Sequence, residues 1–138
     1  MCSVSVDRQV IFWDLRIGLS PVIRLKEVHK SDINTVDWSY LNPNLLATGS
    51  EDTLVKILDV RKAYDTKQFG NPIIETLCKH SSKVQGVKFS PFDSRYLASS
   101  GDSLVIWDIK NLGSEELPIS KSSSFSTQTF DCQHLAME

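Results

Sequence analysis

Hydrophobic residues along the chain fall into short runs in which apolar and polar positions alternate, and turn-forming residues separate the runs. Four such runs lie between residues 28 and 79: they are 28–40, 45–51, 53–60 and 72–78. Asn and Pro at 41–44 predict a turn, and the polar segment 62–72 predicts a loop. Alternation over this length favours four antiparallel β-strands over helices.

The same unit recurs in part on both sides of this segment. Residues 3–16 match its second and third strands and 20–27 supply a fourth, whereas 80–112 match its first three strands. The distance from Ala47 to the closing aspartate is 12 positions (47 to 59), but from Ala98 it is 10 (98 to 108). The last hairpin is therefore two residues shorter, which leaves its register open. The chain divides into a partial unit at 1–27, a complete unit at 28–79, a partial unit at 80–112 and a tail at 113–138.

No segment carries a sustained apolar stripe at helical spacing, so the predicted fold class is all-β. The tail is rich in Ser and Thr, has no recognisable fourth strand and is predicted to be disordered. A formal net charge of −2 gives no basic face for nucleic acid, and no run approaches the roughly 18 apolar residues of a membrane span. Three widely spaced cysteines fit reduced thiols inside the cell.

Three of the apolar runs end in the same way, as IFWDLR at 11–16, KILDVR at 56–61 and VIWDIK at 105–110. The closing aspartates lie 45 and 49 residues apart, and a Trp-Asp pair near the end of a strand at this period resembles the repeat of WD40 propellers. The resemblance implies a WD40 β-propeller fragment with one full four-stranded antiparallel blade and two partial blades. The open sides of the outer blades then predict marginal stability, or self-association through the open blade edges.

Each unit also contains polar residues of the kind that form a buried hydrogen-bond chain in WD40 propellers, from an indole N–H through a hydroxyl and a His to an Asp. The middle unit has Leu58 at the indole position, which predicts a chain broken at that end. The predicted network residues are Ser3, Asp7 and Trp13 in the first unit, His29, Thr48 and Asp52 in the second, and His80, Ser99, Asp102 and Trp107 in the third.

Ser, His and Asp are also the components of a hydrolase triad. Their recurrence in successive units argues against catalysis, because a catalytic constellation is normally unique. The His and Cys residues have no partner at metal-ligand spacing, and the Gly-containing segments 49–52 and 99–102 are predicted hairpin turns rather than phosphate loops. We therefore predict a non-enzymatic protein with no metal and no cofactor.

A narrower resemblance covers residues 11–63, which are similar to the middle blades of retinoblastoma-associated histone-binding proteins, especially the plant MSI-type branch. The Ser-Pro at 20–21, VDW at 36–38, Gly-Asn-Pro at 70–72 and the stretch 98–113 all suit that branch. The resemblance implies binding of histones and of other subunits of chromatin-modifying or assembly complexes involved in transcription regulation. It also implies a nuclear location, with the cytoplasm as an alternative.

The resemblance places partner contacts in the loop before the first strand and in the hairpin between the second and third strands. By position these contacts are Lys30, Asp32 and Glu51 in the second unit and Ser82 and Lys83 in the third.

Residues 7–16 suggest an alternative function, because they resemble the WDxR box of substrate receptors of cullin-RING ubiquitin ligases. That resemblance would make Asp7, Trp13, Asp14 and Arg16 important, with Arg16 exposed and a ligase adaptor as the partner. A truncated propeller without function is the remaining alternative.

Overall fold

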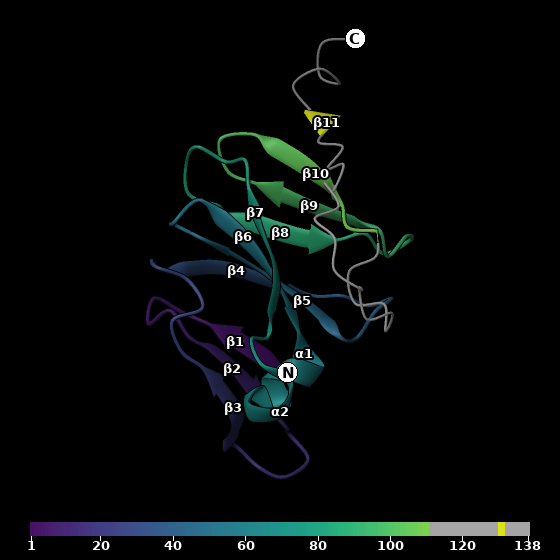
Figure 1. Cartoon of the computed structure of the whole chain (residues 1–138). Coiled ribbons are helices and arrows are strands. Elements are labelled where there is room, and N and C mark those ends of the chain that lie inside the picture. Colours follow the sequence, from purple (N-terminus) through teal and green to yellow (C-terminus); the bar gives the residue numbers. More distant parts are fainter. Residues whose placement is uncertain (111–129, 132–138) are drawn as a thin grey trace.

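The computed structural model describes residues 1–110 and 130–131, which form three antiparallel sheets (Figure 1). The first sheet has the order β1-β2-β3, with β1 at Cys2–Val4, β2 at Val10–Trp13 and β3 at Pro21–Leu25. The second has the order β4-β5-β6-β7, with β4 at Ile33–Trp38, β5 at Leu45–Ser50, β6 at Leu54–Asp59 and β7 at Ile73–Cys78. The third has the order β11-β10-β9-β8, with β8 at Gly86–Phe89, β9 at Tyr96–Ser100, β10 at Leu104–Asp108 and β11 at Phe130–Asp131. These sheets confirm the all-β fold class.

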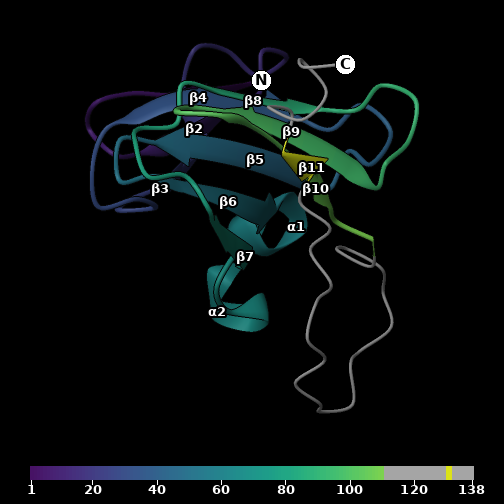
Figure 2. The same ribbon diagram turned by 90° about the horizontal axis from the view of Figure 1, so that it is seen from above.

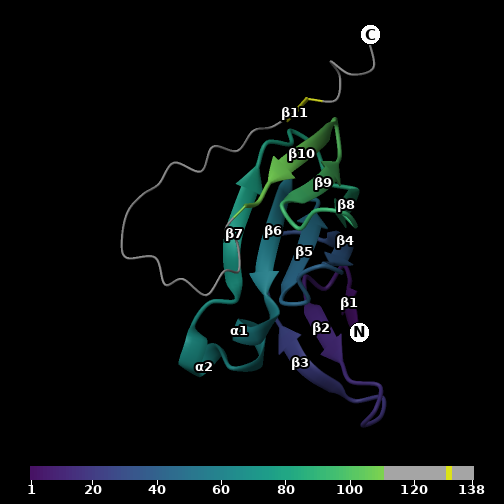
Figure 3. The ribbon, with the colours of Figure 1, turned by 90° about the vertical axis from the view of Figure 1, so that its right-hand side faces the viewer.

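The second sheet lies between the other two in a stack (Figure 1). Strands β1, β4 and β8 lie along one edge of the stack, and β3 and β7 lie toward the opposite edge (Figure 3). Because successive residues of a strand point to opposite faces, each sheet presents two faces to its neighbours. The middle strand β5 shows the result most clearly, since every residue of LLATGS is buried.

Two hydrophobic cores fill the spaces between the sheets. One face of the second sheet contributes Leu46 and Leu58 to a core shared with Val10 and Phe12 of the first sheet. There the ring of Phe12 meets that of Trp38 edge to face, with ring centroids 5.7 Å apart. The other face of the second sheet contributes the core residues Ala47, Val55 and Ile57, which lie with Leu97, Val105 and Trp107 of the third sheet. The sheets therefore hold together through cores that no single sheet contains.

Side chains of β4 also cover the free backbone edge of β8. The Oγ1 atom of Thr35 accepts a hydrogen bond from the backbone N–H of Val87 at 3.3 Å. The carboxylate of Asp37 accepts one from the backbone N–H of Phe89 at 2.8 Å and pairs with the ammonium of Lys88 at 2.8 Å. Because an edge strand leaves backbone groups unpaired, these contacts stabilise the junction between the second and third sheets.

The hairpins of the second and third sheets confirm the predicted difference in length. Gly49 pairs with Val55 across the longer turn, whereas Ser100 pairs with Leu104 across the shorter one. The register beyond the turn is nevertheless the same. Ala47 pairs with Ile57 and Ala98 pairs with Ile106, and each partner lies two positions before the closing aspartate of its sheet. A change of two residues preserves the alternation of side chains, so the same positions still face the core.

The predicted loop at 62–72 is wrong in part, because this connection begins with two short helices. They are α1 at Val60–Tyr64 and α2 at Thr66–Phe69, on the side of β6 and β7 (Figure 2). The side chains of Asp59 and Asp65 cap them by accepting backbone N–H groups of Arg61 and Gln68. Helices this short contain too few residues to show a helical apolar pattern, so only the capping aspartates could have indicated them in the sequence. None of the helices described is long and apolar enough to cross a membrane.

Most of the predicted disordered tail, 113–138, lies outside the described residues. Its composition gives no sign of a fourth strand, but the structure places β11 beside β10. Phe130 pairs with Ile106 and Asp131 with Val105 in antiparallel register. A strand of two residues is too short for an alternating pattern to reveal it.

We predict that Gly49→Ala destabilises the stack. A Cβ at this position would lie 2.6 Å from Cγ1 of Val84 and 2.8 Å from Cγ2 of Thr35. Overpacking of this kind costs about 1–3 kcal/mol, measurable by urea unfolding. The double variant Gly49→Ala/Val84→Ala should lose less than the sum of the two single variants, because the shorter side chain removes the overlap with Cγ1 of Val84. Strict additivity would contradict a direct contact.

Candidate functional site

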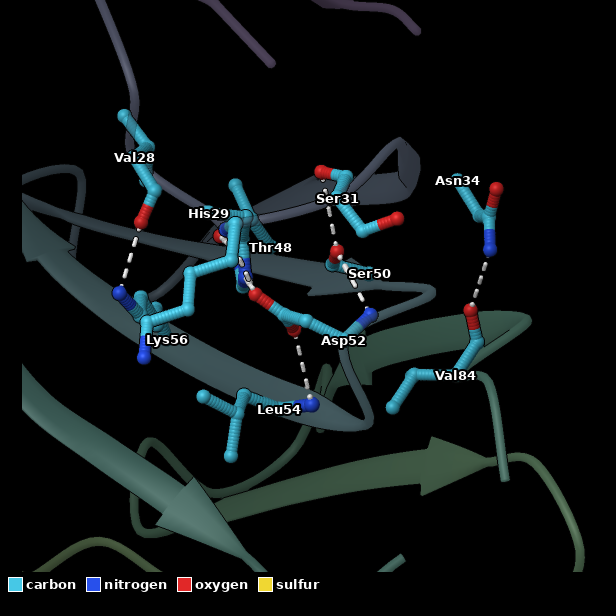
Figure 4. A network of polar contacts seen from close by, with 11 residues as sticks. Val28, His29, Ser31, Asn34, Thr48, Ser50, Asp52, Leu54, Lys56 and Val84 are labelled. Carbon is cyan, nitrogen blue, oxygen red and sulfur yellow. Dashed lines mark hydrogen bonds and ion pairs between the residues drawn. The ribbon is translucent and has the colours of Figure 1, made fainter. Parts of the chain in front are cut away.

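The polar residues of the second unit converge at the hairpin end of the second sheet (Figure 4). His29 lies in the loop before β4, Thr48 on β5 and Asp52 in the β5–β6 hairpin. The Nε2 atom of His29 lies 2.8 Å from Oγ1 of Thr48, and its Nδ1 atom lies 3.0 Å from a carboxylate oxygen of Asp52. The carboxylate also accepts the backbone N–H groups of Lys30 and Leu54. One side chain thus ties a loop, a strand and a hairpin together.

The protonation of this network follows from its burial. The side chain of His29 is fully buried, and burial lowers its pKa from the ordinary value even though Asp52 opposes the shift. A neutral ring donates its Nδ1–H to Asp52 and accepts the Thr48 hydroxyl at Nε2. Burial by itself would raise the pKa of Asp52, but hydrogen bonds from Lys30, Leu54 and His29 outweigh it and lower that pKa. The network is therefore a neutral imidazole beside a carboxylate.

The third sheet holds a longer version of the same chain. The indole of Trp107 donates to Oγ of Ser99 at 2.8 Å, and that Oγ lies 2.7 Å from Nε2 of His80. The Nδ1 atom of His80 lies 3.0 Å from Asp102, which also accepts the hydroxyl of Ser81 at 2.6 Å. The hydrogen bonds from Ser81 and His80 lower the pKa of Asp102 well below its ordinary range.

The first sheet has only the beginning of this chain. The indole of Trp13 donates to Oγ of Ser3 at 2.9 Å. Asp7 does not join them: its carboxylate accepts the backbone N–H of Gln9 within the exposed β1–β2 hairpin. No histidine is available in this unit to connect the two halves, since the first histidine of the chain is His29.

In the second sheet, Leu58 is fully buried at the position of the missing indole. The structure adds a residue that the sequence pattern did not single out. The ammonium of Lys56, which pairs in register with Thr48, donates to the backbone carbonyl of Val28 at 2.7 Å. This contact fastens the loop that carries His29. The signal in the sequence is a Lys among the apolar residues Leu54–Leu58 of β6, at the register of Thr48.

These networks are closed to substrates. Thr48 is fully buried and Ser99 is 1% exposed. The Thr48 hydroxyl is bonded to His29, and the Ser99 hydroxyl is bonded to His80 and Trp107, so neither buried oxygen is available to attack a carbonyl carbon. The arrangement satisfies buried polar groups and fixes loops to sheets. Among the residues that the structure describes, no three His, Cys, Asp or Glu side chains gather to hold a metal ion.

Five candidate contact residues lie at the hairpin end of the second and third sheets, a region we call the hairpin-end surface. They are Lys30, Asp32, Glu51, Ser82 and Lys83. The structure brings several of them together, since the backbone N–H of Glu51 donates to the carbonyl of Asp32 at 3.0 Å. The Glu51 carboxylate lies 4.0 Å from the ammonium of Lys83. Lys30, Ser82 and Lys83 are exposed. The surface therefore mixes both signs of charge in reach of solvent.

Arg16 lies away from this surface, after the far end of β2. Its guanidinium forms a fork with the carboxylate of Asp14, with distances of 2.9 and 2.6 Å, while the Arg16 side chain stays 88% exposed. Hydrogen bonds from Arg16 lower the pKa of Asp14 to about 2. Asp59 and Arg61 form the same fork after β6. The repetition shows that the fork belongs to the geometry of the strand end.

The buried histidine predicts a pH dependence of stability. The pKa of folded His29 lies below 6.5, so the unfolded chain takes up a proton at a higher pH than the folded chain. The free energy of unfolding should therefore fall as the pH drops below about 6.5. We expect this slope, measured by urea unfolding from about pH 7.5 to about pH 5, to be smaller in His29→Gln. Equal slopes in both proteins would contradict the assignment.

Comparisons with known proteins agree with this architecture. Residues 20–59 and 71–108 match the family described as WD domain, G-beta repeat. The chain is 28% identical over 116 residues to Histone acetyltransferase type B subunit 2 of Debaryomyces hansenii, covering 83% of this chain and 28% of that protein. It is 40% identical over 72 residues to WD-40 repeat-containing protein MSI4 of Arabidopsis thaliana, covering 52% of this chain and 14% of that protein.

A guanine nucleotide-binding protein subunit beta of Solanum tuberosum is 31% identical over 110 residues, covering 77% of this chain and 27% of that protein. The chain thus spans less than a third of each of these relatives. The similarity to MSI4 confirms the resemblance to the MSI-type branch. Because the two matched repeats cover more than half of its residues, the chain belongs to the WD40 repeat family.

Proposed function

We propose that this chain is a non-enzymatic protein-interaction scaffold, and that it binds histones as part of chromatin-modifying or chromatin-assembly complexes. The observation that carries the proposal is the separation of its polar groups. The His, Ser, Thr and Asp residues that resemble catalytic groups are engaged in buried networks, whereas the charged residues of the hairpin-end surface reach solvent. A surface held rigidly by buried networks is suited to binding a partner.

The charges of this surface support a histone segment as the partner. Asp32 and Glu51 are joined by a backbone hydrogen bond at the end of the second sheet, and each carries a carboxylate. Histone tails are rich in Lys and Arg, and exposed carboxylates attract such segments and increase their association rate. The contact between Glu51 and Lys83 is long, at 4.0 Å, and the two side chains are 41% and 56% exposed, so a basic ligand can compete for Glu51.

The relatives support the same setting. One of them is named as a subunit of a histone acetyltransferase, and MSI4 shares 40% of the residues in the stretch that it matches. On this proposal the protein works in the nucleus and contributes to transcription regulation. Its partners are histones and other protein subunits rather than nucleic acid.

We predict that Asp32→Lys/Glu51→Lys weakens the binding of core-histone tail peptides by roughly tenfold or more, because two carboxylates become ammonium groups. Fluorescence anisotropy titration of the full chain measures the dissociation constant. The expected loss should be larger at low salt than at high salt, since exposed charges are screened.

Glu75→Lys is the control, because it makes on β7, outside the hairpin-end surface, the same charge change that Glu51→Lys makes within that surface. Binding should survive in this variant with little change. Failure of the unsubstituted chain to bind any core-histone peptide would overturn the proposal, and so would equal losses in the control and the double variant.

A second candidate function follows from the exposed guanidinium of Arg16. The fork with Asp14 holds this side chain in one orientation at 88% exposure, which presents it to a partner such as a ubiquitin-ligase adaptor. On this proposal, Arg16→Ala should abolish co-purification of a cullin-RING adaptor, whereas Arg24→Ala on β3 should leave it intact. Co-purification that survives Arg16→Ala would contradict the assignment.

A further inference from the structure

Three segments of the chain meet at the hairpin-end surface, and hydrogen bonds of the backbone hold them together. The backbone N–H of Glu51 donates to the carbonyl of Asp32 at 3.0 Å, and that of Val84 donates to the last carbonyl of β5 at 2.9 Å. The side chain of Asn34 donates to the carbonyl of Val84 at 3.0 Å (Figure 4). The backbone beside Lys83 is therefore fixed to the second sheet, although Lys83 itself lies in the loop that leads to the third.

Glu51 stands between the two other charged residues of this junction. Its backbone is bonded to Asp32, and its carboxylate lies 4.0 Å from the ammonium of Lys83. Glu51 and Lys83 are both exposed, so water surrounds this ion pair and the pair contributes little to stability. The surface thus offers two carboxylates, and an ammonium of the chain itself is already engaged with one of them.

This ion pair restricts which ligands the surface can bind well. A ligand cation that binds Glu51 takes the place of the Lys83 ammonium. Because the backbone beside Lys83 is fixed, the displaced ammonium stays within reach of its own side chain and repels the arriving cation. A purely basic segment therefore gains one ion pair and loses another. An anion carried next to the ligand's cation removes this loss, because it pairs with the displaced Lys83.

A phosphate group suits the place beside Lys83 better than a carboxylate does. It carries a charge of about −1.5 to −2 at neutral pH and three acceptor oxygens. Ser82 directly precedes Lys83 and is also exposed, so its hydroxyl can donate to the same phosphate that the ammonium binds. Hydrogen bonds between an ammonium and a phosphate are about twice as strong as those between neutral groups.

We propose that the hairpin-end surface prefers a segment in which a phosphoserine directly adjoins a pair of basic residues. The basic pair binds Asp32 and Glu51, and the phosphate binds Lys83 and Ser82. This inference rests on the proposed binding of basic histone segments, and it adds the chemical feature by which the surface selects among them. Phosphorylation of the ligand strengthens binding even though it makes the ligand less basic.

Fluorescence anisotropy titration of the full chain with synthetic peptides tests the proposal. Each peptide contains a Lys-Arg pair and a serine, which directly precedes the pair in one peptide and directly follows it in another, because a segment can cross the surface in either direction. Both are prepared with serine and with phosphoserine. We expect the phosphorylated form to bind about threefold to tenfold more tightly in at least one order. Attraction by net charge alone predicts the reverse, because the phosphate reduces the positive charge of the peptide.

A further peptide separates the effect of position from that of composition. It has the same residues and the same net charge, but a Gly-rich spacer moves the phosphoserine away from the Lys-Arg pair. Its phosphate cannot reach Lys83 while the basic pair occupies Glu51. We therefore expect this peptide to bind no more tightly than its unphosphorylated form.

Lys83→Gln removes the ammonium that the phosphate binds. The preference for the phosphorylated peptide should disappear in this variant. The unphosphorylated peptide should bind as tightly as before or more tightly, because its competitor for Glu51 is gone. Arg24→Gln is the control, since it removes one positive charge from an exposed position on β3, and it should keep the preference. Circular dichroism reports whether both variants are folded.

Equal or weaker binding of the phosphorylated peptides in both orders would overturn the proposal. A preference that survives Lys83→Gln, or that persists when the phosphoserine is moved away, would do the same. Failure to bind any unphosphorylated core-histone peptide counts against the proposed function instead. The two failures are distinguishable, because binding of unphosphorylated peptides tests the proposed function and the difference within each peptide pair tests this inference.

Discussion

A β-sheet of this protein cannot satisfy its own hydrophobic faces, and the rest of the structure depends on that constraint. The residues of β5 are buried along their whole length only because one neighbouring sheet covers Leu46 and another covers Ala47. Stability therefore resides between the sheets, as in other repeat architectures in which each unit contacts only its neighbours. Close approach at Gly49 and the contacts of β4 side chains with β8 belong to the same junctions.

The polar networks hold the hairpins and connecting loops in place on the stacked sheets. Stacked sheets need hairpins and connecting loops that stay in one position, and these segments carry polar backbone groups. His29 and His80 reach inward from the loops, and their Nδ1 atoms are hydrogen-bonded to the carboxylates of aspartates in the hairpins. A chain of groups that elsewhere performs hydrolysis here holds the loops of the hairpin-end surface in place, because burial removes the hydroxyl from solvent while the loop ends remain exposed.

Much of the fold could be predicted because the repeat encodes it in short-range pattern. Alternating strands, turn residues and the shorter last hairpin are local properties, and a two-residue deletion keeps the alternation intact. The helices α1 and α2 were not predicted, because their formation depends on caps by Asp59 and Asp65 rather than on an apolar period. The strand β11 is too short to leave a pattern, and the role of Lys56 requires the loop carbonyl of Val28, 28 positions away.

Residue type and spacing were enough to establish the repeat, the strands and the chemical identity of the networks in the second and third units. How those residues serve the protein depended on packing between segments that are distant along the chain. Packing buried Thr48 and Ser99, and it brought His29 within hydrogen-bond distance of Thr48 and Asp52. It also set which face of each sheet is covered, since alternation assigns residues to two faces but cannot say whether a neighbour is there to bury them.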